Sequence, residues 1–362
     1  MRGTRMLQGD TSAVRGDPAP WDEAIDRMLE AGRARAAAND AQHARLWDAL
    51  AAATRGGKRF RPVLVMAAHD AFGGDQQQAA AAVGAAVELM HTAFVIHDDL
   101  IDGDDVRRGR PNVSGTFRAS ALGDGASVDQ ADSLARTAGI LAGDLALAAS
   151  VRAVATCGAS EAVTHELLDL FDAALHTTAA GELADVRLSM GTHAATLEES
   201  LAMAEQKTSA YSFALPLRAG AVLAGAEGGA VERLGRVGRS LGIAFQLFDD
   251  LIGVFGDPRR TGKSATSDLR TVKQTPLLTH ARSTGEWTRI RTYLGRELTQ
   301  DELGEVRALL TTSGSREFVD ALAAGHQTAA RSEIEQLGVS MAALEVVLRR
   351  PPALAGSDEV AA

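Results

Sequence analysis

Apolar residues recur along most of this chain at intervals of three and four positions. The run Leu167, Leu170, Phe171, Ala174 and Leu175 is one example. Such spacing gathers apolar side chains on one face of an α-helix, and the abundant alanine favours the same conformation. We find no convincing alternation typical of a strand and no Asn-Gly hairpin signal. The pattern therefore predicts a nearly all-α protein.

Breaks in this pattern divide the chain into about ten predicted helices. They fall at residues 56–57, 72–74, 103–125, 225–229, 256–258 and 313–315. No change in composition marks a second domain, so we expect one large helical bundle from about residue 22 to residue 350. Residues 1–21 and 351–362 are predicted to be flexible tails, and the polar segment 111–132 a long connection between helices.

Two acidic clusters each follow an apolar, helix-periodic run. Asp98, Asp99 and Asp102 end the first run, and Asp249 and Asp250 follow the second. A carboxylate left unpaired in an otherwise buried helix would cost roughly several kcal/mol. The two clusters therefore suggest a shared metal site, although an ion pair with Arg or Lys on another helix would also satisfy the second cluster.

Residues 77–102 are predicted to form a single helix with a polar face near its carboxyl end. His91, Asp98 and Asp102 share that face, so the two acids could hold a metal from consecutive turns. Asp99 is rotated by about 100° and would support the site or lie in solvent. Carboxylates at a helix carboxyl end are unfavourable without a compensating cation, which favours a functional interpretation of this cluster.

Basic segments accompany the acids. Arg107 and Arg108 follow the first cluster, and the segment 56–62 places Lys58 and Arg61 at a predicted helix start. Backbone N–H groups at a helix start attract anions together with such cations. Acids that hold Mg²⁺, beside arginines that bind phosphate oxygens in a fork geometry, suit a metal-bound diphosphate.

Other basic residues are weaker candidates for anion binding. Lys207, followed by Thr208, is one candidate, and Lys263 lies in the loop that follows the second acidic cluster. Arg270 and Lys273 are predicted to extend into solvent, as most long basic side chains do.

The composition fits a protein with a large core and limits its partners. Of the 362 residues, 46% are hydrophobic, and the net charge of −10 gives no electrostatic reason to expect nucleic acid. Cys157 is the only cysteine, which excludes an internal disulfide and a Cys-rich zinc site and fits a reducing interior. There is no apolar signal-peptide core and no run of roughly 18 uncharged apolar residues. We expect a cytoplasmic protein without a transmembrane segment.

In order and spacing, the motifs from Gly56 to about Leu278 resemble those of the trans-type isoprenyl diphosphate synthases, the polyprenyl synthetase family. The resemblance implies an all-α bundle with a central active-site cavity, usually assembled as a homodimer. It implies that isopentenyl diphosphate condenses head to tail with an allylic diphosphate, with three Mg²⁺ ions and release of pyrophosphate. The departing pyrophosphate takes the lost proton, so no side-chain base is required.

The resemblance also implies a role for each candidate residue. Isopentenyl diphosphate would be bound by Lys58, Arg61, His91 and Arg108, and the allylic diphosphate by Arg107, Lys207 and Lys263. Mg²⁺ would be held by Asp98, Asp102 and Asp249, with Asp250 as a further ligand on the second side. Thr208 and Gln246 would direct oxygens toward the developing carbocation.

Two positions depart from the family pattern. Gly253 stands where a third aspartate of the second cluster is common, and Asp257 cannot simply replace it because Gly256 and Pro258 end the predicted helix first. Ser209 stands where alanine is usual, a change that we expect to be minor.

Product length in the family depends on the cavity floor beneath the first acidic cluster, where Ala93 and Phe94 match. Phe94 lies four residues before Asp98, about 5.4 Å below it, so it would limit the depth. We therefore predict geranylgeranyl diphosphate, with farnesyl or longer polyprenyl diphosphates as alternatives. Phe94 could instead be only a core aromatic residue.

Two other functions remain open at this point. A class I terpene cyclase shares an aspartate-rich motif and Mg²⁺, but we would expect an Asn/Ser/Glu-type second metal motif and a more aromatic cavity. A non-catalytic regulatory subunit of a heteromeric prenyl synthase would be expected to lose aspartates, and here only the position of Gly253 lacks one.

Overall fold

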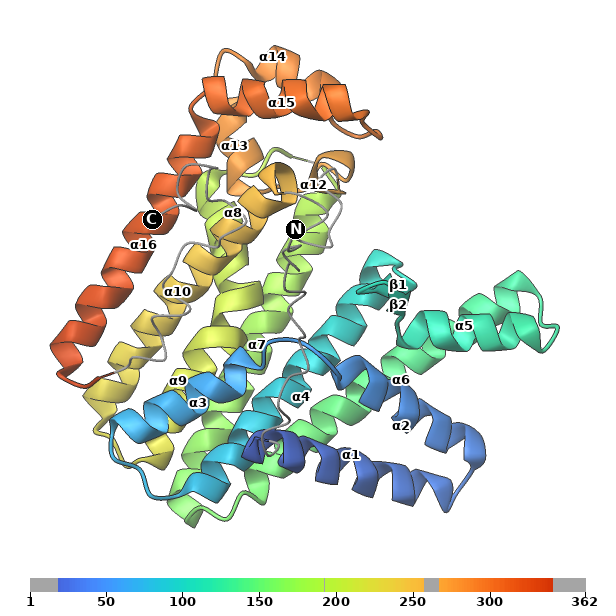
Figure 1. Ribbon diagram of the computed structural model, residues 1–362, viewed down its shortest axis with the longest axis vertical. Coiled ribbons are helices and arrows are strands. Elements are labelled where there is room, and N and C mark those ends of the chain that lie inside the picture. Colours follow the sequence, from blue (N-terminus) through green and yellow to red (C-terminus); the bar gives the residue numbers. More distant parts are fainter. Residues whose placement is uncertain (1–18, 192, 257–266, 341–362) are drawn as a thin grey trace, which may run out of the picture.

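The computed structural model describes residues 19–191, 193–256 and 267–340, and helices account for most of them (Figure 1). The first half contains α1 (Pro20–Ala37), α2 (Ala41–Thr54), α3 (Phe60–Ala71), α4 (Gln77–Asp102), β1 (Val106–Arg107), β2 (Arg110–Pro111), α5 (Val113–Gly123), α6 (Val128–Ala155) and α7 (Glu161–Ser189). The second half contains α8 (Leu197–Ala204), the π-helical segment η1 (Glu205–Ala214), α9 (Leu215–Leu223), α10 (Gly228–Phe255), α12 (Ser267–Arg270), α13 (Pro276–Arg282), α14 (Trp287–Ile290), the 3₁₀ turn η2 (Arg291–Tyr293), α15 (Gln300–Thr312) and α16 (Ser315–Leu337).

Local sequence signals set several helix ends. Ser127, Thr196 and Thr299 each accept a hydrogen bond from the backbone N–H three residues on, and form capping boxes at the starts of α6, α8 and α15. Asp40 caps α2 in a similar way. Gly103, at φ 73°, takes the left-handed conformation that ends α4 directly after its last aspartate.

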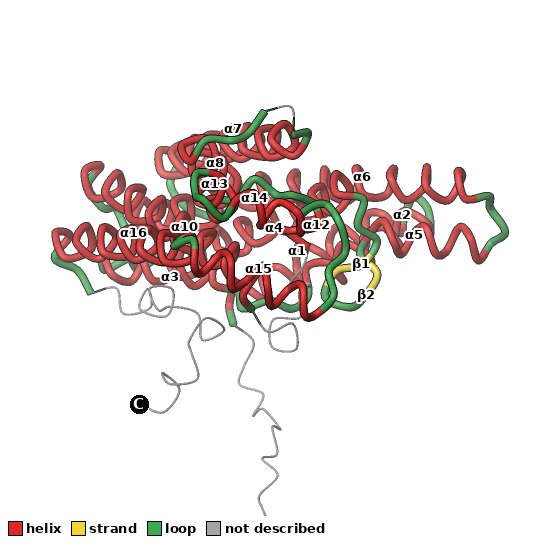
Figure 2. The backbone as a smooth tube through the Cα atoms, turned by 90° about the horizontal axis from the view of Figure 1, so that it is seen from above, coloured by secondary structure: helices red, strands yellow, loops and turns green. Residues whose placement is uncertain are grey.

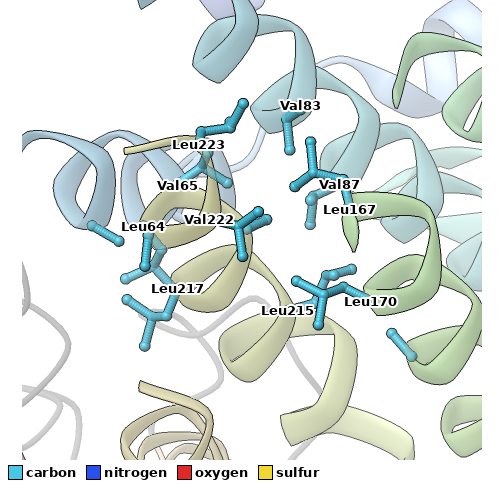
Figure 3. Close-up of a cluster of buried hydrophobic side chains, with 14 of the residues drawn as sticks. Leu64, Val65, Val83, Val87, Leu167, Leu170, Leu215, Leu217, Val222 and Leu223 are labelled. Atoms are coloured by element: carbon cyan, nitrogen blue, oxygen red, sulfur yellow. The ribbon is translucent and has the colours of Figure 1, made fainter. Parts of the chain in front are cut away.

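The largest apolar core is built from residues of α3, α4, α6, α7, η1, α9, α10 and α16. Figure 3 shows part of it, with leucine and valine side chains from α3, α4, α7 and α9 directed toward one another. Met90 of α4 and Phe171 of α7 are also buried there. A second core joins α10 to α12–α16, and a third joins α4 to α1, α2, α5 and α6. The helix that carries the first acidic cluster is therefore packed from two sides.

The packing order brings α7, η1 and α10 side by side. The segment η1 packs against both α7 and α10, and α10 also packs along α16. In Figure 1, α12 and the β1–β2 hairpin lie toward the same end of the bundle as the carboxyl end of α10. The two acidic helices thus direct their carboxyl ends toward one region of the molecule.

The nearly all-α prediction is confirmed, and so is the single helix Gln77–Asp102. The predicted long connection at 111–132 is wrong, because α5 occupies Val113–Gly123, capped by Asn112. The two short antiparallel strands β1 and β2, yellow in Figure 2, precede it. Each strand has only two residues, which is too short to show alternating polar and apolar residues in the sequence. The chain after residue 267 also forms more short helices than predicted.

The boundaries of the tails and the bundle remain a prediction. Residues 1–18 and 341–362 lie outside the described residues, and α1 already begins at Pro20, inside the stretch assigned to the first tail.

By length and composition alone, α4 and α6 could each cross a membrane. In α4, 78% of the most apolar window is buried inside the fold, as in a core helix of a soluble protein. In α6 only 44% is buried, so an apolar face of this helix is left uncovered. Two such helices are weak evidence for a membrane span.

Candidate functional site

The carboxyl end of α4 presents Asp98 to two cations. Lys207 Nζ lies 2.9 Å from Asp98 Oδ1, and Arg107 Nη2 lies 3.3 Å from Asp98 Oδ2. Arg107 also donates through Nε to Asp99 Oδ1 at 2.6 Å. Asp99 is only 3% exposed, so it anchors Arg107 from behind rather than lying in solvent. Burial raises the pKa of Asp99, and the neighbouring Arg107 opposes that change.

Lys207 is enclosed by three carboxylates from two helices. Besides Asp98 it contacts Asp185 at 2.7 Å and Glu182 at 3.0 Å, both on α7. Burial alone would lower the pKa of Lys207, but the three acids raise it above its usual value. Gly181 permits this arrangement, since a side chain there would clash with the backbone N of Lys207.

Sequence reasoning missed Glu182 and Asp185. They lie on α7, far from either acidic cluster in the sequence, and they form no recognisable motif. The one available signal is their position three residues apart on a single helix, directly after Gly181, a residue small enough for another helix to approach.

Asp102 belongs to the same group of charges. Burial raises the pKa of Asp102, the charges of Asp98 and Asp185 raise it further, and Lys207 and Lys273 lower it. Asp102 therefore interacts electrostatically with both Asp98 on α4 and Asp185 on α7, and with the two lysines between the clusters.

A hydrogen-bonded chain links η1 to the second acidic cluster. Thr208 Oγ1 lies 3.1 Å from Gln246 Oε1, to which it donates, and Gln246 Nε2 donates to Asp250 Oδ1 at 2.9 Å. Asp250 is 4% exposed, and burial raises its pKa to about 7 although Lys273 opposes the change. Asp249 is partly buried beside it and also has interaction partners.

The prediction that Lys273 lies in solvent is wrong. It is partly buried, and the charges of Asp250, Asp268 and Asp185 raise its pKa against the effect of burial. Because Lys273 also acts on Asp102, it lies within electrostatic reach of both acidic clusters. Arg270, by contrast, is exposed and 3.3 Å from Glu297, as expected of a surface residue.

The structure brings together two basic segments of the sequence, the loop 56–59 before α3 and Arg108. A Cβ on Gly56 would lie 3.2 Å from Nη1 of Arg108, so the glycine allows the guanidinium to lie against the loop before α3. Arg108 itself has a φ of 53°, a conformation that non-glycine residues seldom adopt. Lys58 is exposed in the same loop.

Arg61 is buried under the site and held from several directions. Both its Nε and Nη2 donate to Ser212 Oγ, at 3.1 and 2.9 Å. Glu88, 5% exposed on α4, pairs with Arg59 at 3.0 Å and lies 3.9 Å from Arg61. Glu88 thus fixes the start of α3 against α4 and offsets part of the positive charge.

His91 lies among these arginines. Its Nδ1 is 3.0 Å from the hydroxyl of Tyr211. Burial lowers the pKa of His91 well below the usual value, and Arg61, Arg108 and Arg107 lower it further. The neutral imidazole can accept from Tyr211 and still offer an N–H at its other nitrogen.

The predicted floor residues lie in different cores. Phe94 packs edge to face against Tyr211, with ring centroids 4.9 Å apart, beside the main core. Ala93 is completely buried in the third core with α5 and α6. Of the two residues, Phe94 lies next to Tyr211 of η1.

The donor set suits a hard divalent cation. Among the described residues no group of three or more His, Cys, Asp or Glu forms a ready-made metal cage. Mg²⁺ commonly binds through one or two carboxylates plus substrate phosphate and water rather than in such a cage. The oxygens of Asp98 and Asp102, with Asp249 and Asp250 on the other helix, fit that chemistry. Lys263 lies outside the described residues.

Comparison with known proteins supports the same interpretation. A sequence model of the polyprenyl synthetase family matches residues 43–310. A (2E,6E)-farnesyl diphosphate synthase of Mycobacterium tuberculosis is 34% identical over 292 residues, which cover 78% of this chain and 75% of the relative. A geranylgeranyl diphosphate synthase of the same organism is also 34% identical, over 344 residues that cover 92% of this chain and 88% of the relative.

A solved structure extends the similarity to the fold. The geranylgeranyl pyrophosphate synthase of Corynebacterium glutamicum, in complex with isoprenyl diphosphate and magnesium, superposes with a TM-score of 0.82 at 27% identity. The alignment covers 91% of this chain and 95% of that one.

Lys207→Met should destabilise the metal-free protein. It would leave Asp98, Asp185 and Glu182 facing one another without a cation, at a cost of about 2 kcal/mol, less than for a fully buried pair because Lys207 is partly accessible. Urea denaturation in EDTA measures the change. Arg270→Met, at an exposed ion pair, is the control and should cost little. Equal effects of the two substitutions would contradict this assignment.

His91→Gln should alter how stability depends on pH. The folded protein resists protonation of His91 while the unfolded chain takes up a proton below about pH 6.5, so wild-type stability should fall as the pH is lowered. This contribution is at most about 1.4 kcal/mol per pH unit and is absent in the variant. Urea denaturation at several pH values from 7.5 to 5.5 tests it, with His176→Gln on the surface as the control. A difference between wild type and variant that does not change with pH would refute it.

Proposed function

The chain belongs to the polyprenyl synthetase family and is a prenyltransferase that elongates prenyl diphosphates, and on that premise we propose that it makes geranylgeranyl diphosphate from isopentenyl diphosphate and an allylic diphosphate. The observation that carries the proposal is the meeting of two acidic helices around Lys207 and Lys273. The curated relatives are prenyl diphosphate synthases, so they do not favour a terpene cyclase or a non-catalytic subunit.

The allylic diphosphate is assigned to the space between the two acidic clusters. Asp98 and Asp102 on one side, with Asp249 and Asp250 on the other, would hold three Mg²⁺ ions. When bound, Mg²⁺ neutralises phosphate charge and stabilises the pyrophosphate leaving group. The guanidinium of Arg107 and the ammonium of Lys207 lie beside Asp98, so both can donate to the same diphosphate. Lys263 is proposed as a third donor.

Isopentenyl diphosphate is assigned to the neighbouring basic pocket. Lys58 and Arg61 at the start of α3, with Arg108 folded over the glycines, can bind its diphosphate. His91 adds an N–H donor, since Tyr211 occupies its other nitrogen. The second substrate is thereby held beside the allylic carbon. This proximity accelerates the reaction without a covalent intermediate.

Polar oxygens from η1 and α10 line the space between these two assignments. Thr208 and Gln246 are hydrogen-bonded to each other, and both carry oxygens that can face a developing carbocation. The described residues place no nucleophile next to a base here, and the departing pyrophosphate can accept the lost proton. The side chains therefore bind, orient and exclude water.

Assembly and location are further parts of the proposal. Val128, Leu134, Ile140, Leu141 and Val151 on α6 are exposed apolar residues, and a second copy of the chain would cover them in a homodimer. The single cysteine and the buried position of α4 support a soluble, cytoplasmic enzyme. The net charge of −10 gives no electrostatic reason to propose nucleic acid as a partner.

Purified protein should convert isopentenyl diphosphate and farnesyl diphosphate to a C20 product in the presence of Mg²⁺. Chromatography and mass spectrometry identify the product, and EDTA should abolish it. Asp102→Asn should reduce turnover at least about 100-fold because it removes a proposed metal ligand. Asp124→Asn, at the exposed position directly after α5, should leave turnover unchanged. A main product longer than C20, or a C15 product that accumulates from geranyl diphosphate and is not elongated, would refute the proposed length. No condensation product from either starter would refute the catalytic proposal.

Phe94→Ala should lengthen the products, since it removes the ring that packs on Tyr211 below Asp98. The expected result is a shift of the main product by at least one five-carbon unit, read by chromatography of the dephosphorylated alcohols. Phe318→Ala removes a partly buried ring of α16 that packs against the second core, and serves as the control. An unchanged product distribution in Phe94→Ala would exclude Phe94 as the floor.

A further inference from the structure

The missing third acid of the second cluster has a structural counterpart. Gly253 is buried on α10, four residues after Asp249. A Cβ on Gly253 would lie 3.2 Å from Cγ of Asp268 and would clash with its Oδ2. The carboxylate of Asp268 therefore occupies the space into which a side chain at position 253 would extend.

The placement of Asp268 follows from the packing of α12. Leu269, the next residue, is fully buried in the core that also contains Leu251 and Val254 of α10. The backbone carbonyl of Asp268 accepts a hydrogen bond from the N–H of Lys273 at 3.0 Å, which closes the turn after α12. These contacts hold Asp268 against α10, and only glycine at position 253 leaves room for its carboxylate.

The charge of Asp268 reaches the members of the second cluster. It raises the pKa of Asp250, after the larger effect of burial, and it raises the pKa of Lys273 together with Asp250. Asp268 thus shares a cationic neighbour with Asp250. These electrostatic effects agree with the position of the Asp268 carboxylate against α10.

We propose that Asp268 supplies the third carboxylate of the second acidic cluster, from α12 instead of from position 253, and that it stabilises hydrated Mg²⁺ bound at Asp249. The inference rests on the proposed diphosphate site. Mg²⁺ keeps several water ligands in such sites, and a nearby carboxylate accepts hydrogen bonds from them. Position 253 carries no acid, but the second acidic cluster still has a third carboxylate, that of Asp268.

The test is a set of substitutions that remove, displace and relocate the carboxylate. The affinity for Mn²⁺, used in place of Mg²⁺, is measured by electron paramagnetic resonance on the full chain with inorganic pyrophosphate present. Asp268→Asn should weaken Mn²⁺ binding about tenfold or more, the usual effect of losing a supporting carboxylate. Gly253→Ala should weaken it as well, because the methyl group displaces Asp268.

The relocated variant gives the decisive comparison. Gly253→Asp combined with Asp268→Gly moves the carboxylate onto α10 and should restore Mn²⁺ affinity to within about threefold of wild type. Gly253→Asp alone should not, because two carboxylates then compete for one space. Asp301→Asn, exposed on α15, is the matched control. Thermal unfolding checks each variant, and Gly253→Ala carries the test if Asp268→Asn does not fold.

Two results would overturn the proposal. One is wild-type Mn²⁺ affinity in folded Asp268→Asn or Gly253→Ala, and the other is a folded relocated variant that binds no better than Asp268→Asn. Failure of the proposed function would be seen separately. If the wild-type protein made no C20 product, the Mn²⁺ affinities of the variants would still test the role of Asp268.

Discussion

The contact of Lys207 with Asp98, Asp185 and Glu182 is the interaction on which the rest of the site depends. It joins α4, α7 and η1 at one point, and η1 then carries Thr208 to Gln246 on α10. Without a cation at this point, three carboxylates would face one another in a partly buried space. The lysine therefore holds the metal-free protein in an arrangement whose oxygens can also serve a divalent cation.

The charges of the site are arranged as two unequal compartments. Around Asp98 and Asp250 the acids outnumber the lysines, and the pKa values of Asp102 and Asp250 are raised. Around His91 the arginines dominate, and the imidazole stays neutral. An anion that arrives with Mg²⁺ suits the first compartment, whereas a free diphosphate suits the second. This division would allow a chain of net charge −10 to bind the two proposed diphosphate substrates.

The fold class and the helix Gln77–Asp102 could be predicted because they depend on local periodicity. Most residues of the candidate site could be proposed because their motifs are contiguous in sequence. Asp185 and Lys273 could not, since only tertiary packing brings them to the clusters. The helix α5 could have been predicted in part, since its buried residues Val113, Phe117 and Ala121 recur at four-residue intervals among small and polar residues. The reason for a glycine at position 253 could not be predicted either, because it depends on the carboxylate of Asp268, a residue on another helix.

The central claim is that both acidic helices serve one diphosphate site. A double-mutant cycle tests it most directly, with pyrophosphate binding in the presence of Mg²⁺ measured by calorimetry for Asp98→Asn, Asp249→Asn and the double variant. If the two acids hold one ligand, each substitution alone should remove most of the binding free energy, and the double variant should lose far less than the sum. Additive losses would contradict the account, because independent sites do not couple.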